Sequence, residues 1–262
     1  MKVYKAYAKV NIFLKITGLR DNYHEIISRF MKVDTLYDEL YFASKEDCGG
    51  KTEAFVIKGD FACDVYQNTI YKAYFALKKA TESEKLEQLM RTHGVCVQKN
   101  IPAFAGLGGG SSDAATYLKM CNEVLHLGLS LNELAVIGLE VGADVPFFIY
   151  GYNSANVSGI GERVVEFNEE SLAFEVFTPK VEISTPKVYQ KYRSTFYAPI
   201  TEAESVRLQR ALSIDILTSM DADEANDLFV PAKDEYTQLI LHHKKGWHFS
   251  GSGSSFFRVI QG

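Results

Sequence analysis

The chain has 262 residues, of which 47% are hydrophobic, and a formal net charge of −5 at pH 7. This length allows one large or two modest domains with substantial cores. The negative charge argues against general nucleic-acid binding, which needs a basic field. No run approaches 18 apolar residues, and the first residues lack the apolar core of a signal peptide. The sequence therefore predicts neither a membrane span nor a signal peptide.

The four cysteines, Cys48, Cys63, Cys96 and Cys121, are scattered along the chain without a Cys-x-x-Cys pair. This spacing favours reduced thiols over a disulfide framework or a metal site. We therefore expect a cytoplasmic location and predict no protein-bound metal.

The first predicted element is a strand over residues 2–17, where polarity alternates. One face would carry Val10, Ile12, Leu14 and Ile16, and the other Lys9, Asn11, Phe13 and Lys15. By itself, the polar pair of Lys9 and Asn11 is most simply a solvated strand face. A turn over residues 17–22 should follow, and then Tyr23 and His24, which alone suggest ordinary surface residues.

The next elements lead toward a glycine-rich stretch. A loop with a weak strand is expected over residues 44–60. Asn68 is a plausible N-cap for a helix that runs to about Lys79. Alternating Val95 and Val97 predict a strand over residues 94–99, which delivers the chain to Pro102.

The stretch from Ile101 to Ala115 contains four glycines within five residues, and Ser111 and Ser112 follow them. Glycine lets the backbone turn sharply and approach a ligand closely. Apolar residues then recur at helical spacing, so a glycine loop leads into a helix N-terminus. Unpaired N–H groups and the helix dipole make this end an anion site, and the obvious anion is a phosphate.

Two common phosphate loops do not fit this stretch. A Walker A loop ends in Gly-Lys-Ser/Thr, and no lysine follows these glycines. The dinucleotide fingerprint needs a third glycine where this chain has Ser111. The remaining alternative is a turn that caps a helix through Ser111 or Ser112, although a plain cap needs one glycine and not four.

Ser130 and Glu133 form a potential capping box for a helix through Val141, which Gly142 would end. Asp144 follows in an apolar setting, where a carboxylate needs a partner or caps a turn. Pro146 is expected to keep Val145 out of the helical conformation. Beyond these residues, the sequence predicts two strands within residues 163–183 and helices over residues 201–226. A glycine-serine turn should enter a last strand at residues 256–260.

The pattern Pro-x3-Gly-Leu-Gly-Gly-Gly-Ser-Ser-x-Ala-Ala, which begins at Pro102, resembles the phosphate loop of the GHMP kinases. Its Gly-Leu-Gly-Gly-Gly-Ser-Ser form is most similar to one family of that superfamily, the 4-diphosphocytidyl-2-C-methyl-D-erythritol kinases. Further segments that resemble this family are residues 8–14, 23–24, 37–40, 68–73, 142–148, 159–162, 184–189, 226–229 and 250–253. The resemblance covers most of the chain and is weakest at residues 44–62 and 195–225. The carboxy-terminal part also looks short for the family.

The resemblance implies an α+β, two-domain GHMP kinase fold with the active site in the cleft between domains. An ATP-binding domain would span residues 1–152, and a second domain residues 153–262. The implied reaction is the ATP-dependent phosphorylation of the 2-hydroxyl of 4-diphosphocytidyl-2-C-methyl-D-erythritol, with Mg²⁺ bound to the nucleotide. The expected partner is this small-molecule cytidine-diphosphate-linked polyol, without nucleic acid or membrane. The resemblance is compatible with a monomer or a weak homodimer.

The resemblance also assigns residues to roles. Asp144 would be the catalytic base, and Lys9 would orient it and stabilise charge on the transferring group. The residues implied to bind ATP are Asn68, Pro102, Ala103, Phe104, Ala105, Gly106, Leu107, Gly108, Gly109, Gly110, Ser111 and Ser112. Those implied to bind the acceptor are Asn11, Tyr23, His24, Tyr189, Gly251, Ser252 and Gly253. A hydroxyl of Ser111 or Ser112 would help hold Mg²⁺, and Asp113 is expected to point away from the phosphates.

Two alternatives stay open. One is another GHMP small-molecule kinase of the mevalonate or homoserine type, which the pair of Tyr23 and His24 and the triple glycine disfavour. The other is a non-catalytic nucleotide-binding regulator of the same fold. The presence of both Lys9 and Asp144 disfavours a regulator of this kind.

Overall fold

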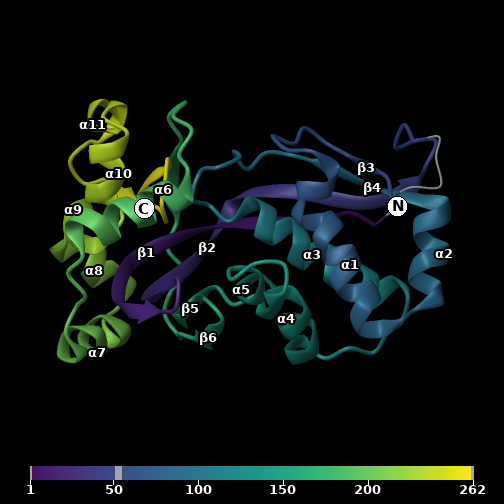
Figure 1. Ribbon diagram of the computed structural model, residues 1–262, viewed down its shortest axis with the longest axis horizontal. Helices are drawn as coiled ribbons and strands as arrows, with labels where there is room; N and C mark the ends of the chain where they lie inside the picture. The colour runs from purple at the N-terminus through teal and green to yellow at the C-terminus, as the bar shows by residue number, and fades with distance from the viewer. Residues whose placement is uncertain (1, 51–54, 261–262) are drawn as a thin grey trace. The chain divides into compact units, whose positions relative to one another are not determined.

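The computed structural model describes residues 2–50 and 55–260 (Figure 1). The chain divides into two compact units. Unit 1 consists of residues 1–8, 36–103 and 109–151, and unit 2 of residues 9–35, 104–108 and 152–262. Two long strands, β1 (Tyr4–Arg20) and β2 (Tyr23–Ser44), pair with each other and contribute residues to both units. Residues 51–54, part of the expected loop over residues 44–60, lie outside the described residues.

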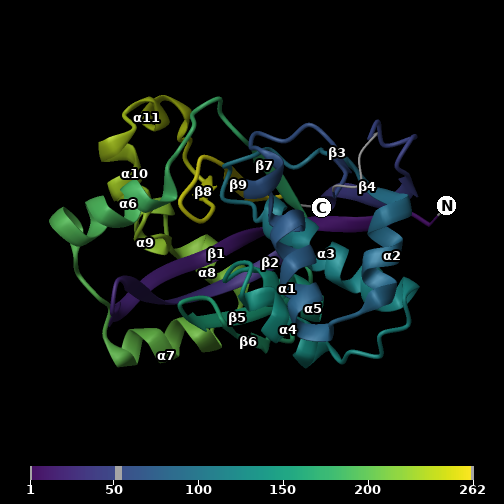
Figure 2. The same ribbon diagram turned by 45° about the vertical axis from the view of Figure 1, so that its right-hand side comes forward.

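Unit 1 contains short strands and a group of helices. Strand β4 (His93–Gln98) pairs antiparallel with residues 39–44 of β2, and β3 (Ile57–Lys58) runs parallel to β4. The helices are η1 (Val65–Gln67), α1 (Thr69–Thr81), α2 (Glu84–Thr92), α3 (Gly109–Val124), α4 (Leu131–Leu139) and α5 (Val145–Tyr150). Helix α3 packs against α1 and α5, and the packing of α1 beside α3 can be followed in Figures 1 and 2.

The predicted helix starts of unit 1 are confirmed. The Asn68 side chain accepts a hydrogen bond from the Ile70 N–H at 2.9 Å, which caps α1. Ser130 and Glu133 form the expected capping box of α4. The helix after the glycine loop also forms, although it begins earlier than a serine cap would allow, at Gly109.

One local prediction is wrong. Val145 is the first residue of α5 rather than a non-helical residue before Pro146. Proline fits this position because N–H groups in the first helical turn have no intrahelical partner. Asp144, immediately before α5, has helical backbone angles (φ −80°, ψ −15°) instead of the extended backbone typical of an N-cap.

Unit 2 contains a sheet edge, a second small sheet and most of the remaining helices. Strand β5 (Ser154–Gly159) pairs antiparallel with residues 26–31 of β2 and with β6 (Arg163–Glu166). The second sheet has the order β7–β9–β8, formed by Phe174–Phe177, Phe256–Val259 and His248–Phe249. The helices are α6 (Thr185–Lys191), the π-helical η2 (Tyr192–Phe196), α7 (Glu202–Arg210), α8 (Ser213–Ser219), α9 (Ala222–Ala225), α10 (Phe229–Glu235) and α11 (Gln238–His242). The predicted strands, helices and last strand of this region are therefore confirmed.

Strand β1 departs from the expected alternation of buried and solvated faces. Lys9 and Asn11 are only 3% and 2% exposed, so the simple interpretation as a solvated face is wrong. Apolar residues of the same strand enter the core of unit 2, where Leu14 and Ile16 pack with Phe229 and Phe249. Both faces of this strand segment are covered, and its polar side chains must find partners inside the protein.

The prediction of four reduced thiols is wrong for two of the cysteines. Cys48 and Cys96 form a disulfide with a Cα–Cα distance of 6.1 Å, whereas Cys63 and Cys121 are free. The turn after β2 brings Cys48 beside β4, and the pair packs with Ala43 and Val56. The sequence separation of 48 residues hides this proximity.

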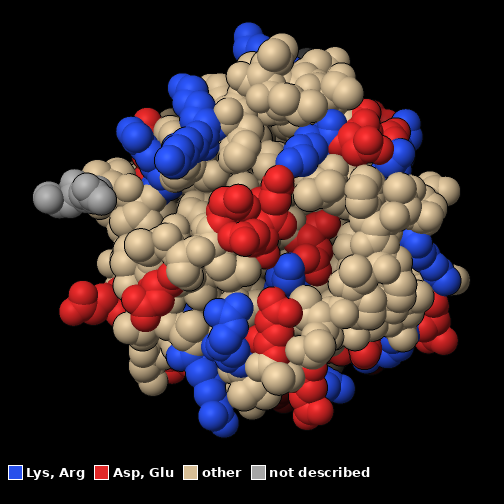
Figure 3. All heavy atoms as spheres, turned by 90° about the vertical axis from the view of Figure 1, so that its left-hand side faces the viewer, with Lys and Arg blue, Asp and Glu red and all other residues tan. Residues whose placement is uncertain are grey.

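Figure 3 shows one face of the molecule, on which Lys and Arg side chains lie interspersed with Asp and Glu side chains. Opposite charges therefore partly cancel over this face. Among residues 2–50 and 55–260, none of the helices combines the length and the apolar character needed to cross a bilayer.

Candidate active site

Unit 2 holds the middle of the glycine loop, residues 104–108, through backbone carbonyls. The Lys9 N–H donates to the Leu107 carbonyl at 3.0 Å, which ties the loop to β1. The Ser255 N–H donates to the Ala105 carbonyl at 3.1 Å, and the Ser250 hydroxyl donates to the Gly106 carbonyl at 2.9 Å. The loop is thus held by the strand of Lys9 and by the glycine-serine turn, both of which the sequence had linked to the site.

Gly106 shows why glycine is needed in this loop. Its φ is +73°, and a Cβ at this position would lie 2.1 Å from the Ser250 carbonyl oxygen. Glycine is therefore required at this position by the neighbouring backbone of the protein itself, whether or not a ligand is bound. A side chain here would force the glycine-serine turn away from the loop.

Lys9 and Asn11 form a buried polar chain in unit 2. The Lys9 ammonium donates to the Asn11 amide oxygen at 2.6 Å and lies 4.4 Å from the centre of the Phe30 ring. The Asn11 amide in turn donates to the Ser28 hydroxyl at 2.9 Å. A Cβ on Gly251 would lie 3.5 Å from the Asn11 amide oxygen. The structure thus brings together Lys9, Asn11 and Gly251, which the sequence had assigned to one site.

His24 and Tyr189 also meet in unit 2. Their ring centres are 5.0 Å apart, and the Tyr192 ring lies 5.8 Å from His24. Burial, with a smaller effect of the Arg193 charge, lowers the pKa of His24, which favours the neutral imidazole at pH 7. Within residues 2–50 and 55–260, the His24 Nε2 is buried without a hydrogen-bond partner. Tyr23, in contrast, is 64% exposed and does not join this cluster of rings.

The start of α6 is connected to the glycine-serine turn. The Thr185 and Ser252 hydroxyls are hydrogen-bonded at 2.6 Å. Tyr189 lies one helical turn further along α6. Ser252 and Tyr189 therefore belong to one connected part of unit 2, and Gly253 adopts the positive φ of +94° needed for the tight turn.

Unit 1 holds the helical end of the glycine loop. Helix α3 begins at Gly109, so Ser111 and Ser112 lie in its first turn and do not cap it. The Thr69 hydroxyl donates to the Gly110 carbonyl at 2.6 Å, which joins the start of α1 to that of α3. A Cβ on Gly109 would lie 2.9 Å from the Ile101 side chain. Pro102 and Ala103 are exposed, whereas the carboxyl of Asp113 is turned inward and pairs with Lys99 at 2.7 Å.

Asp144 is half-buried in unit 1 and immediately precedes α5. Asn68 is buried and uses its amide oxygen to cap α1. The capping interpretation of Asn68 is therefore confirmed, and its contact with a nucleotide stays a prediction.

Sequence reasoning missed several residues that shape the site. The Asn226 amide donates to the carbonyls of Phe249 and Gly251, both at 2.9 Å, and so fixes the glycine-serine turn. Asp38 binds Lys99 and accepts the N–H groups of Asn100 and Ile101, just before the glycine loop. The Asn226-Asp227 pair and the Asp38 segment were visible as family-like patterns, but only the contacts define what these side chains do.

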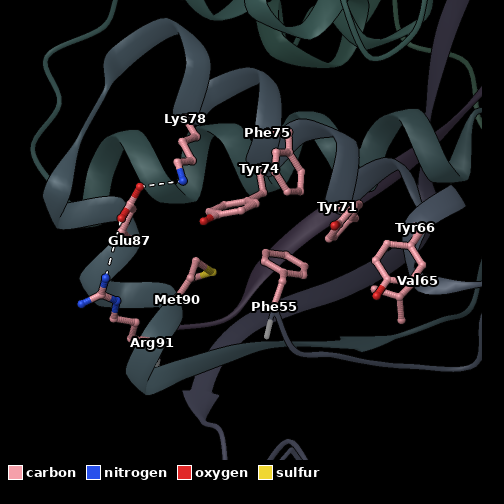
Figure 4. Close-up of a pocket in the computed structure, with 10 residues that line it drawn as sticks. All are labelled: Phe55, Val65, Tyr66, Tyr71, Tyr74, Phe75, Lys78, Glu87, Met90 and Arg91. Atoms are coloured by element: carbon pink, nitrogen blue, oxygen red, sulfur yellow. Dashed lines mark ion pairs between the residues drawn. The ribbon is translucent and has the colours of Figure 1, made fainter. Parts of the chain in front are cut away.

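A separate hollow of about 410 Å³ lies in unit 1 beside α1 and α2 (Figure 4). Five aromatic side chains face it, those of Phe55, Tyr66, Tyr71, Tyr74 and Phe75. At one side, Glu87 pairs with Lys78 at 2.6 Å and with Arg91 at 3.9 Å. None of the residues that the sequence assigns to a role lines the described part of this hollow.

Comparison with known proteins decides the family. The model of the GHMP kinases N terminal domain matches residues 68–152. A 4-diphosphocytidyl-2-C-methyl-D-erythritol kinase from Sulfurimonas denitrificans is 64% identical over 262 residues, covering 99% of this chain and 97% of that protein. The chain belongs to the 4-diphosphocytidyl-2-C-methyl-D-erythritol kinase family. A family member from Campylobacter jejuni subsp. doylei is 38% identical and covers 97% of this chain and 99% of its own length.

The solved structures agree with this family. A crystal structure of 4-(cytidine 5'-diphospho)-2C-methyl-D-erythritol kinase matches with a TM-score of 0.75 and 28% identity, covering 100% of this chain and 91% of that one. The mevalonate kinase of Methanococcus jannaschii matches with a TM-score of 0.61 but only 11% identity, covering 99% and 90% of the two chains. The second likeness shows the fold alone. The predicted α+β GHMP kinase fold and the kinase activity are thereby confirmed.

Proposed function

We propose that this family member transfers the γ-phosphoryl group of ATP to the 2-hydroxyl of 4-diphosphocytidyl-2-C-methyl-D-erythritol. The observation that carries the proposal is the 64% identity, over nearly the whole chain, to a protein of that name. The connected groups around Lys9, His24 and the glycine loop support it, because they provide the parts that such a transfer needs.

The nucleotide phosphates are assigned to the glycine loop, residues 102–112. N–H groups in the first turn of α3 have no intrahelical acceptor and can bind an anion, and the helix dipole adds positive potential. Ser111, which is half-buried, is better placed than the buried Ser112 to offer a hydroxyl ligand to Mg²⁺. When bound, Mg²⁺ supplies positive charge that offsets the charge of the phosphates. Phosphoryl transfer then depends mainly on positioning and charge stabilisation.

The acceptor hydroxyl is assigned to Asp144 and Lys9. An alcohol has a pKa far above 7, so a carboxylate that takes the proton as transfer proceeds assists the reaction. Asp144 has this role in our proposal. The Lys9 ammonium stabilises negative charge on the transferring group, and its hydrogen bond to Asn11 restricts where that charge lies.

The cytidine end of the acceptor is assigned to His24 and Tyr189. An aromatic ring stacks on the flat face of cytosine, which contributes about 0.5–1.5 kcal/mol beyond area burial. The His24 imidazole can donate or accept a hydrogen bond at a base edge, and within the described residues its Nε2 has no protein partner. Asn11 and the turn at Gly251, Ser252 and Gly253 are assigned to the rest of the acceptor, and Tyr23 to its exposed edge.

A coupled assay of ADP release tests the proposed function. Wild-type protein is supplied with Mg²⁺-ATP and, in separate reactions, with 4-diphosphocytidyl-2-C-methyl-D-erythritol, mevalonate or homoserine. Of the three acceptors, we expect only the cytidine-linked one to give rapid ADP release. Its product should carry a phosphate on the 2-hydroxyl. Faster turnover of mevalonate or homoserine would support the other kinase types, and a protein that binds ATP without turnover would support the regulator.

Assembly and location are further parts of the proposal. A monomer or weak homodimer in the cytoplasm suits an enzyme whose two substrates are small and soluble. Size-exclusion chromatography with light scattering, at several protein concentrations, measures the assembly state.

A further inference from the structure

The two ends of the glycine loop meet at a buried group of charges in unit 1. Asp38, on β2, is fully buried and accepts the N–H groups of Asn100 and Ile101 at 2.5 and 2.8 Å. Its second carboxylate oxygen accepts a hydrogen bond from the Lys99 ammonium. Three groups just before Pro102 are thus bound by one carboxylate.

Lys99 connects this carboxylate to the other end of the loop. Its ammonium also donates to Asp113, in the early part of α3, at 2.7 Å. Burial disfavours the charged ammonium, but Asp113 and Asp38 more than offset this effect and raise the pKa of Lys99 above its ordinary value. Lys99 is therefore a charged link between two acidic side chains, and hydrogen bonds from an ionised donor are stronger than neutral ones. Burial, together with the Asp38 charge and against the Lys99 charge, raises the pKa of Asp113 to about 7.

Packing at the same place leaves little freedom. A Cβ on Gly109 would lie 2.9 Å from the Ile101 side chain and 3.7 Å from the Lys99 ammonium nitrogen. The Asn100 amide donates to the Tyr37 carbonyl at 2.8 Å, which adds a second bond from the same segment to β2. The residues before the loop and the first turn of α3 are thus held against each other.

We propose that Asp38, Lys99 and Asp113 clamp the two ends of the glycine loop and thereby position its N–H groups for the nucleotide phosphates. The inference rests on the proposed role of the loop in binding the triphosphate. Lys99 and its two partners are positioning residues, because they act through the loop backbone. Loss of the clamp should weaken nucleotide binding and leave acceptor binding nearly unchanged. Without the clamp, the loop must become ordered when the nucleotide binds, and this loss of conformational entropy lowers the affinity for the nucleotide.

The test compares Lys99→Met and Lys99→Arg with wild type. The readouts are the Kd for ADP from calorimetry, the KM values for ATP and for the acceptor, and thermal unfolding. We expect Lys99→Met to raise the Kd for ADP and the KM for ATP by about tenfold or more, with the acceptor KM within about twofold. Lys99→Arg retains the charge and donors and should recover most of the affinity.

Lys119→Met is the matched control, because Lys119 is a part-buried lysine of α3, the helix of Asp113, and its ammonium donates to the Phe148 carbonyl at 2.8 Å. It should lower the unfolding temperature without changing the Kd for ADP. Asp113→Ala and Asp113→Asn test the other end without touching the bond between Asp38 and Lys99. The alanine variant should weaken ADP binding, and the asparagine variant, which keeps an acceptor for Lys99, should bind ADP nearly as wild type does.

The clamp is overturned if folded Lys99→Met and Asp113→Ala bind ADP as tightly as wild type, or if Lys119→Met weakens ADP binding equally. Wild-type protein that fails to bind ADP at all contradicts the proposed role of the loop itself. The two failures are therefore distinguishable.

Discussion

At the scale of single residues, Lys9 is the side chain whose environment differs most from what its sequence suggests. An alternating strand normally sends a lysine to solvent, yet Lys9 is buried and bound to Asn11. A buried ammonium needs compensating partners, and the Asn11 amide oxygen and the Phe30 ring are two of them. Asp144 is a half-buried carboxylate immediately before the apolar helix α5.

We predict that Asp144→Asn retains acceptor binding and lowers kcat by about a hundred- to ten-thousandfold, the usual range for loss of a general base. Lys9→Met should also lower kcat. Because the proposed roles place both groups at one transfer step, the double variant should be little worse than either single variant. Steady-state kinetics on the three variants measure this, and losses that multiply would show that the residues act independently.

The role of a residue could be predicted from the sequence only where the residue stands in a recognisable motif. Lys9, His24 and the glycine loop stand in family-like segments, and the structure places Lys9 beside Asn11 and His24 beside Tyr189. Lys99 could not be singled out because its partners lie in other elements, 61 residues away at Asp38 and 14 residues away at Asp113. Sequence periodicity and motif spacing do not predict a tertiary contact of this kind.

At the scale of elements, the glycine-serine turn between β8 and β9 depends on a side chain from another segment. Asn226 follows α9, is 1% exposed and donates to two carbonyls of the turn. Its amide oxygen accepts the Leu228 N–H at 2.9 Å. The Asn226 side chain therefore provides donors for two carbonyls and an acceptor for one N–H group, and an amide is the group that offers both.

We predict that Asn226→Ala lowers the free energy of unfolding by about 1–3 kcal/mol, because buried carbonyls lose their donor. Asn226→Asp should be at least as harmful, since a carboxylate faces the carbonyls with oxygen instead of N–H groups. Urea unfolding of both variants checks this order. An aspartate variant as stable as wild type would show that the amide donors are dispensable.

A buried ion pair joins Arg29 of strand β2 to Glu169, which lies between β6 and β7 and also accepts the Ser213 N–H at the start of α8 at 2.7 Å. The Arg29 side chain is fully buried, pairs with Glu169 at 3.3 Å and donates to Asn156 at 2.7 Å. Burial lowers the pKa of Arg29, and the Glu169 charge opposes this effect. The arginine thus depends on its carboxylate partner.

We expect Glu169→Ala to lower the free energy of unfolding by about 3–5 kcal/mol, because it leaves a buried guanidinium uncompensated. Glu140→Ala, which removes the partner of the exposed Lys79, is the matched control and should change stability little. Urea denaturation compares the two. Equal, small losses for both variants would refute the importance of the buried pair.

Element boundaries were predictable where local chemistry decides them, as at the Asn68 cap and the capping box of Ser130. They were not predictable where tertiary packing decides them. Val145 is helical despite Pro146, and α3 begins at Gly109, two residues before the first serine. The disulfide of Cys48 and Cys96 likewise follows from strand packing and not from cysteine spacing.

At the scale of the whole molecule, the family accounts for the fold and for the kinase activity. The glycine loop illustrates what the family pattern leaves out. Its middle, residues 104–108, groups with unit 2, and its flanks group with unit 1. The domain boundary at residue 152 stays a prediction, and the Lys9 N–H bond to the Leu107 carbonyl shows that the loop is held by a residue far from it in sequence.

The central claim is that this kinase recognises a cytidine-diphosphate handle far from the transferred group. Cytosine presents an N4 amino donor and an N3 acceptor, whereas uracil presents the opposite pattern at these positions. A mismatched buried partner costs about 1–3 kcal/mol, and remote binding energy also positions the reacting hydroxyl.

The most direct measurement is the ratio of kcat/KM for the cytidine-linked acceptor to that for its uridine-linked analogue, in wild type and in His24→Ala. We predict a wild-type ratio of about ten or more, which falls toward one in His24→Ala. Equal kcat/KM values for the two acceptors in the wild-type enzyme would contradict the account.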